Sequence, residues 1–160
     1  MKTERFITVG ALLLAAGCLW STRSSSQESI KKAAEMEKVT GIGGVFMKAR
    51  DPKAMAAWYR AQLGIQVKNG YADFDWREKE NPDRIGHTTW SLFPSNTTYF
   101  GSSTSPYMIN YRVRDLEAML DQLRQAGATI DSKIDDTDYG RFGWAMDPEG
   151  NRIELWEPKP

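Results

Sequence analysis

The sequence predicts an α+β domain assembled from two similar half-modules, each with the element order β-α-β-β-β. The motif Arg-Asp-x-x-Ala-Met-x4-Arg begins at Arg50 and again at Arg114, an offset of 64 residues. Each copy follows a short alternating run and opens an amphipathic helix. A period of this length is too long for a solenoid unit and too short for two full domains, so we expect one domain with an internal repeat.

The first half-module is expected to span residues 41–94, with strands at 41–49, 65–67, 71–76 and 87–93. Asp51 followed by Pro52 is a favoured N-cap and first helical residue, and Gly64 is favoured just beyond a helix end. These residues predict a helix between them. Asn69-Gly70 predicts a tight turn before the third strand.

The second half-module is expected to span residues 106–158, with strands at 107–113, 128–130, 139–146 and 152–156. Asp115 is the expected helix cap, and Gly127 is expected to end that helix. Pro148 and Gly150 predict a turn before the last strand, because Pro presets φ and Gly supplies a positive φ. A polar bridge joins the two half-modules.

The first 18 residues resemble a bacterial lipoprotein signal. Lys2 and Arg5 precede a short apolar run, and small residues precede Cys18, the only cysteine. We therefore expect a signal peptide at 1–18 with Cys18 lipidated, a Ser-rich tether at 19–38 and the folded domain at 39–160. The expected location is the bacterial cell envelope, where the chain is either lipid-anchored or periplasmic or secreted. An ordinary secretory signal and an uncleaved anchor remain open alternatives.

The bulk composition excludes some partners. Lys plus Arg and Asp plus Glu both number 21, so the formal net charge is zero and no nucleic-acid partner is expected. The expected contacts are an unidentified small molecule and the membrane, the latter through the N-terminal lipid. A single cysteine also excludes an intramolecular disulfide.

The run Asp-Pro-Glu-Gly-Asn-x-Ile-Glu-Leu at 147–155, together with the two helix caps, resembles the vicinal oxygen chelate superfamily. This superfamily includes glyoxalases, bleomycin-resistance proteins and extradiol dioxygenases. The resemblance spans roughly residues 39–158. It implies that the two half-modules form one cupped mixed sheet, and it also implies a homodimer, because many such proteins complete the cup at a dimer interface.

The resemblance implies four metal-ligand positions, of which Glu154 matches one. The other three fall on Gly44, Trp90 and Met108, none of which suits a hard divalent ion. His87, the only histidine, lies three residues from Trp90, and odd spacing on a strand points to the opposite face. We therefore expect no cofactor, with a Zn, Ni, Mn or Fe site using Glu154 and His87 as the alternative.

Strand alternation from these positions predicts a ligand pocket with an apolar wall and a few polar groups. The expected wall is Phe46, Trp90, Met108 and Trp156, and the expected polar groups are Asn110, Arg112, Arg141 and Glu154. Alternatively, the aromatic side chains fill the cup. A buried Glu154 requires either an ion pair, with Arg112, Arg141 or Arg152, or a raised pKa suited to a general base.

The function expected from the resemblance is metal-independent binding of a small molecule, as in bleomycin-resistance proteins. One alternative is a metal-dependent lyase or isomerase of glyoxalase type, or a dioxygenase, that uses Glu154. Another is an envelope interaction module with an exposed aromatic face around Tyr99 and Phe100.

Overall fold

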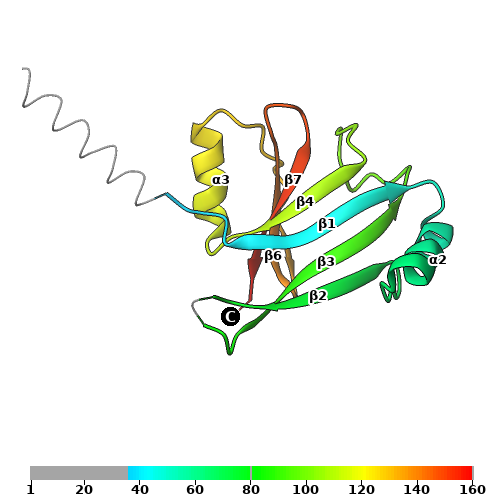
Figure 1. Ribbon diagram of the computed structural model, residues 1–160. Coiled ribbons are helices and arrows are strands. Elements are labelled where there is room, and N and C mark those ends of the chain that lie inside the picture. The colour runs from blue at the N-terminus through cyan, green and yellow to red at the C-terminus, as the bar shows by residue number, and fades with distance from the viewer. Residues whose placement is uncertain (1–35, 80, 160) are drawn as a thin grey trace, which may run out of the picture. The chain divides into compact units, whose positions relative to one another are not determined.

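The computed structural model describes residues 36–79 and 81–159, which form a seven-stranded mixed sheet and two helices (Figure 1). The predicted signal peptide and Cys18 lie outside the described residues. No helix within the described part of the chain is long and apolar enough to cross a membrane. The strands are β1 (Gly41–Ala49), β2 (Tyr71–Arg77), β3 (Ile85–Pro94), β4 (Tyr107–Arg112), β5 (Asp135–Thr137), β6 (Gly140–Met146) and β7 (Arg152–Pro158), and the helices are α2 (Pro52–Leu63) and α3 (Leu116–Gln125).

The sheet has the order β2-β3-β1-β4-β7-β6-β5 and repeats about its centre. β1 and β4 lie antiparallel at the middle, and each pairs in parallel with the last long strand of its own half-module, β3 or β7. The neighbouring strands β2 and β6 are antiparallel to β3 and β7. Figure 1 shows β1 and β4 side by side across this centre. The predicted α+β fold of two related half-modules is confirmed.

Both helices begin at the predicted caps. The Asp51 carboxylate accepts a hydrogen bond from the backbone N–H of Ala54 at 2.9 Å, and Asp115 accepts one from Ala118 at 2.9 Å. These bonds satisfy N–H groups that have no partner inside the helix. Gly64 follows α2 with φ of +70°, a conformation that favours glycine.

Two of the predicted short strands do not form. Residues 65–67 do not form a strand, because the N–H of Val67 bonds the nearby carbonyl of Ile65 rather than a neighbouring strand. The expected strand at 128–130 contributes only the bridge from Ile130 to Ala145. In its place the edge strand β5 pairs with β6, and its polar sequence carries no alternating signal.

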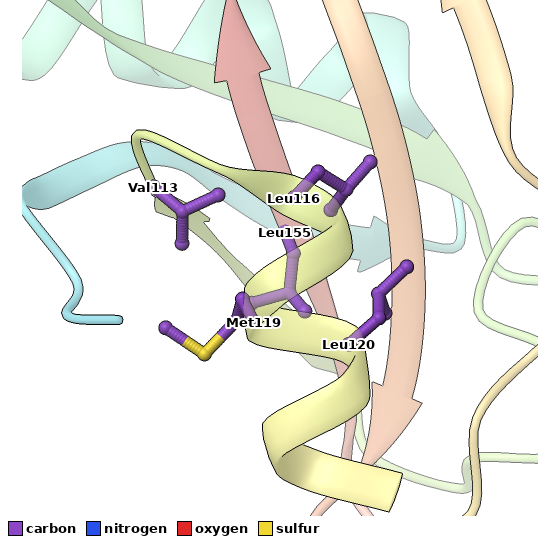
Figure 2. Close-up of a cluster of buried hydrophobic side chains, with 5 residues drawn as sticks. All are labelled: Val113, Leu116, Met119, Leu120 and Leu155. Carbon is purple, nitrogen blue, oxygen red and sulfur yellow. The ribbon is translucent and has the colours of Figure 1, made fainter. Parts of the chain in front are cut away.

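The helix-facing core is built by α3 against the second half of the sheet (Figure 2). Its buried side chains are Val113, Leu116, Met119, Leu120 and Leu155. Side chains alternate along a strand, so a residue next to Leu155 points to the opposite face. A second buried cluster, of Phe46, Phe100, Met108 and Trp144, packs separately from this helix-facing core.

Candidate functional site

A hollow of about 590 Å³ contains Glu154, the residue next to Leu155 in β7. It therefore lies on the face of the sheet that α3 does not cover. Half of its lining is aromatic: Phe46, Tyr71, Phe93, Tyr99, Tyr139, Phe142 and Trp156. Its volume is within the range of pockets that bind small organic molecules.

Glu154 is the buried acid of this hollow. Glu154 is only 1% exposed, and both of its carboxylate oxygens accept a hydrogen bond from the Tyr99 hydroxyl at 2.9 Å. Burial disfavours the charged form and raises the pKa of Glu154 from 4.5 to about 7, although the hydrogen bond from Tyr99 opposes this rise. Burial and the neighbouring Glu154 charge also raise the pKa of Tyr99. The carboxyl group therefore changes its protonation state near neutral pH.

Of the two alternatives for a buried Glu154, the ion pair with an arginine does not form among the described residues. Each candidate arginine is paired elsewhere: Arg112 with Glu78 at 2.8 Å, Arg141 with Glu117 at 2.6 Å, and Arg152 with Asp131 at 2.8 Å. Arg141 is next to Phe142, which lines the hollow, so its side chain points to the opposite face, where it meets Glu117 of α3. Within residues 36–79 and 81–159, no cation forms a salt bridge with Glu154. The Tyr99 hydroxyl donates to it, and the Asn110 and Trp144 side chains also lie close enough to lower its pKa.

Asn110 supplies a buried acceptor beside this acid. It lies opposite Glu154 in the β4–β7 register and is 3% exposed. Its Oδ1 atom has no hydrogen-bond partner among the described residues. A Cβ atom on Gly43 would lie 2.2 Å from this oxygen and 2.6 Å from the Trp156 ring, so only glycine leaves the present space beside the carbonyl. A buried acceptor without a partner is costly, and this oxygen lies against Gly43, so a ligand N–H or O–H in the hollow reaches it only if the Asn110 amide turns.

The first half-module lines the hollow with a polar wall. His87 Nδ1 lies 2.7 Å from the Asp75 carboxylate, and the Thr89 hydroxyl donates to Asp73 at 2.7 Å. His87, Asp73 and Thr89 all line the hollow. Because Asp75 engages one ring nitrogen of His87, the other nitrogen remains for a ligand or solvent, and the imidazole side chain is 55% exposed.

The side chains of β3 that face the hollow are not the predicted ones, because the alternation along the strand is shifted by one residue. Trp90 does not line the hollow: its ring packs edge-on against Tyr59 of α2, with centroids 4.7 Å apart. The odd spacing does place His87 on the other face, and that face is the one with the hollow. Phe46 in β1 and Asn110 in β4 are equivalent positions of the 64-residue repeat. Ser91 pairs with Phe46 and Glu154 pairs with Asn110, so Ser91 is the counterpart of Glu154 in the first half-module.

Of the eight predicted pocket residues, the structure brings four together at the hollow: Phe46, Asn110, Glu154 and Trp156. Trp90 and Arg141 face the helices, and Arg112 bonds Glu78 outside the hollow. Met108 is 1% exposed and lies in the buried cluster with Phe100 and Trp144. Part of the cup is therefore filled, as the alternative expected, and part is open.

The exposed aromatic face expected around Tyr99 and Phe100 is absent from the described surface. Phe100 is fully buried at 0% exposure, and Tyr99 stacks on Phe93 with centroids 5.1 Å apart. The bridge between the half-modules turns inward at this point. Sequence reasoning missed Tyr99 as a site residue, because the bridge is polar and its two adjacent aromatic residues were the only signal.

The donor set does not fit a divalent metal ion. A catalytic site typically needs about three protein ligands. The described residues contain no group of three or more His, Cys, Asp or Glu side chains placed to hold one ion. The positions that could complement Glu154 carry Ser91 and Met108, and a thioether is a weak ligand for hard ions.

Comparisons with known proteins agree with this geometry. A family model described as a glyoxalase-like domain matches residues 44–156. No curated protein matches the chain. A variant of methylmalonyl-CoA epimerase from Streptomyces coelicolor, in complex with 2-nitronate-propionyl-CoA, is 16% identical with a TM-score of 0.57, covering 77% of this chain and 100% of that one. A hypothetical protein from Bacillus halodurans is 10% identical with a TM-score of 0.52, covering 75% and 95%.

A methylmalonyl-CoA epimerase from Mycobacterium tuberculosis is 22% identical with a TM-score of 0.47, covering 80% of this chain and 96% of that one. At these identities, the two structures with TM-scores above 0.5 establish the fold and not the ligand.

Proposed function

We propose that this chain, which belongs to the glyoxalase-like domain family, binds a small organic molecule in its central hollow without a metal ion, as bleomycin-resistance proteins do. The observation that carries the proposal is the hollow of about 590 Å³, half of whose lining is aromatic and which holds the protonatable Glu154 beside Asn110. A turn of the Asn110 amide towards a ligand N–H would give its unpaired Oδ1 a hydrogen-bond partner.

The lining favours a flat ligand with an N–H donor. Half of the lining residues are aromatic, and the polar lining residues Asn110 and Glu154 carry oxygens that can accept hydrogen bonds. No Lys or Arg of the described residues lines this hollow. Aromatic faces attract cations, and an ionised Glu154 would pair with one. A planar, weakly basic nitrogen compound satisfies both features.

The test compares 4-aminoquinoline with naphthalene, its apolar analogue, by thermal shift and tryptophan fluorescence. We expect saturable binding of the amine and much weaker binding of the hydrocarbon. Replacing Asn110→Leu should weaken amine binding about 10-fold or more, because a buried hydrogen bond is lost. The matched control is Asn81→Leu at an exposed position. Equal affinities for the Asn110 variant and the wild type, or for both compounds, would refute the proposal.

A second candidate is a lyase or isomerase of glyoxalase type in which Glu154 removes a proton from a substrate carbon. The pKa of about 7 favours it, because a general base works best when its pKa is near the working pH. The measurement is deuterium uptake from D₂O into a hemithioacetal, which Glu154→Gln should abolish. The metal-dependent version is tested by elemental analysis after incubation with Zn, Ni, Mn and Fe(II).

We also propose that the chain is attached to the bacterial envelope through a lipid on Cys18. The support is the sequence pattern of Lys2, Arg5, the apolar run and Cys18. Incorporation of a palmitate analogue should be lost in Cys18→Ser.

A homodimer is proposed from the family resemblance alone, and light scattering of the purified protein measures it.

A further inference from the structure

A second hollow, of about 1100 Å³, is lined by a different set of residues, at the end of the sheet where β1 begins and β2 ends. Its lining is rich in cations: Lys38, Arg77, Lys79, Arg84, Arg112 and Arg114. The only carboxylates of the described lining are Glu78 and Glu157. This local excess of positive charge contrasts with the zero net charge of the whole chain.

The two carboxylates are already engaged. Glu78 bonds Arg112 at 2.8 Å and lies 3.6 Å from Arg84, while Glu157 accepts from the backbone N–H of Leu116 at 2.7 Å. In contrast, Lys38, Arg77 and Arg114 are exposed and form no salt bridge within residues 36–79 and 81–159. Arg77 donates to the Pro82 carbonyl at 2.7 Å, which does not neutralise its charge, so no described carboxylate offsets these three charges.

Exposed aliphatic side chains lie among these cations. Val39 and Ile42 line the same hollow and are 48% and 45% exposed. Ile85, which is 52% exposed, pairs with Arg77 at the end of the β2–β3 ladder. Basic groups attract the anionic headgroups of a bilayer, and interspersed aliphatic groups insert at the boundary between headgroups and acyl chains.

We propose that this basic surface, defined as Lys38, Arg77, Lys79, Arg84 and Arg114 with Val39 and Ile42, docks on a bilayer that contains anionic phospholipids. Charge complementarity selects the anionic lipid. The described chain begins at Met36, only two residues before Lys38, so the surface lies where the proposed lipid-anchored tether enters the domain. The proposal thus rests on the proposed envelope attachment and not on the central hollow.

The experiment uses the full chain with Cys18→Ser, which removes acylation as a source of binding. Sedimentation measures its partition onto vesicles of phosphatidylcholine with and without phosphatidylglycerol, at low and high salt. We expect stronger binding to the phosphatidylglycerol vesicles, lost at high salt because exposed charges are screened. The N-terminal segment, with its apolar run and with Lys2 and Arg5, is the same in every variant below, so comparison between variants removes its contribution.

The decisive variant is Lys38→Gln/Arg77→Gln/Arg114→Gln. Its phosphatidylglycerol-dependent partition should fall about 100-fold, since each basic side chain near an anionic surface contributes roughly fivefold. The matched control is Lys53→Gln/Lys68→Gln/Lys133→Gln, which removes the same charge from exposed positions outside this surface and should leave the partition nearly unchanged.

Three results would overturn the proposal. They are equal binding to both vesicles, undiminished binding by the decisive variant, and displacement of the protein from vesicles by soluble glycerol phosphate, which would assign the hollow to a free anion. Retention of 4-aminoquinoline binding by the decisive variant shows that it is folded. It also separates failure of membrane docking from failure of the central-hollow proposal.

Discussion

Glu154 concentrates the unusual chemistry of this domain in one side chain. A buried carboxyl group with a raised pKa binds its proton more tightly in the folded than in the unfolded chain. Its contribution to stability is therefore fully present below pH 4.5 and declines as the pH rises towards about 7, above which it stays constant. Tyr99 limits this loss by donating to the ionised form.

Replacing Glu154→Gln should remove this pH dependence. The wild type should lose about 3 kcal/mol of unfolding free energy between pH 4.5 and pH 7 from this group, whereas the variant, which is always neutral, should not. Urea denaturation at several pH values measures the difference. Glu149→Gln, at an exposed turn, is the control. Parallel pH profiles for Glu154→Gln and the wild type would contradict the assignment of the raised pKa.

Gly43 controls the space around Asn110. Replacing Gly43→Ala places a Cβ atom 2.2 Å from Asn110 Oδ1, so the amide must move. We expect a loss of roughly 1–3 kcal/mol in unfolding free energy, as for other overpacked sites, together with loss of 4-aminoquinoline binding. Gly41→Ala is the control, because the nearest atoms there are 3.9 Å away. A Gly43 variant as stable and as active in binding as the control would disprove this role.

At the scale of elements, the two helices share a cap motif but differ in what they bury. α3 places Leu116, Met119 and Leu120 in the core, whereas no residue of α2 is fully buried. Helix stability in proteins comes mostly from packing of an apolar face, because short helices are marginal alone. We therefore infer that α3 anchors its half-module more strongly than α2 does.

Truncation of one leucine in each helix tests this difference. Leu120→Ala should lower the unfolding free energy by about 2–5 kcal/mol, because it leaves a cavity in the core. Leu63→Ala in α2, where the side chain is 60% exposed, should change it by less than about 0.5 kcal/mol. Chemical denaturation measures both. Similar losses would show that α2 is covered in solution by something outside the described residues.

At the scale of the whole domain, the two half-modules share one sheet and one hollow. The β1–β4 ladder joins them at the centre, and the bridge residue Tyr99 reaches Glu154 in the second half. The hollow takes its polar wall from β2 and β3 and its buried acid from β7. Neither half-module therefore builds the site alone.

This sharing predicts cooperative unfolding of the domain. Far-ultraviolet circular dichroism and tryptophan fluorescence should give coincident urea transitions, because breaking the β1–β4 ladder exposes the hollow and both cores together. Two separated transitions would instead show that the half-modules unfold independently.

The sequence alone predicted the repeat, the helix caps and most strands. These features depend on local signals, such as Asp51-Pro52, Gly64 and Asn69-Gly70, in which a few neighbouring residues set the backbone. The resemblance carried by the run at 147–155 predicted the fold. Alternation from Glu154 predicted the side of Trp156, and alternation from Met108 predicted that of Asn110; both residues line the hollow.

The tertiary structure alone decided the rest of the candidate site. A shift of one residue exchanges the two faces of a strand. The prediction took Trp90, instead of Ser91, as the inward position of β3, so it placed Trp90 in the pocket and His87 on the opposite face. Arg112, Arg141 and Arg152 found carboxylates contributed by distant segments, which no local pattern specifies. Tyr99 reaches Glu154 across 55 residues of sequence, and only the folded bridge brings the phenol to the acid.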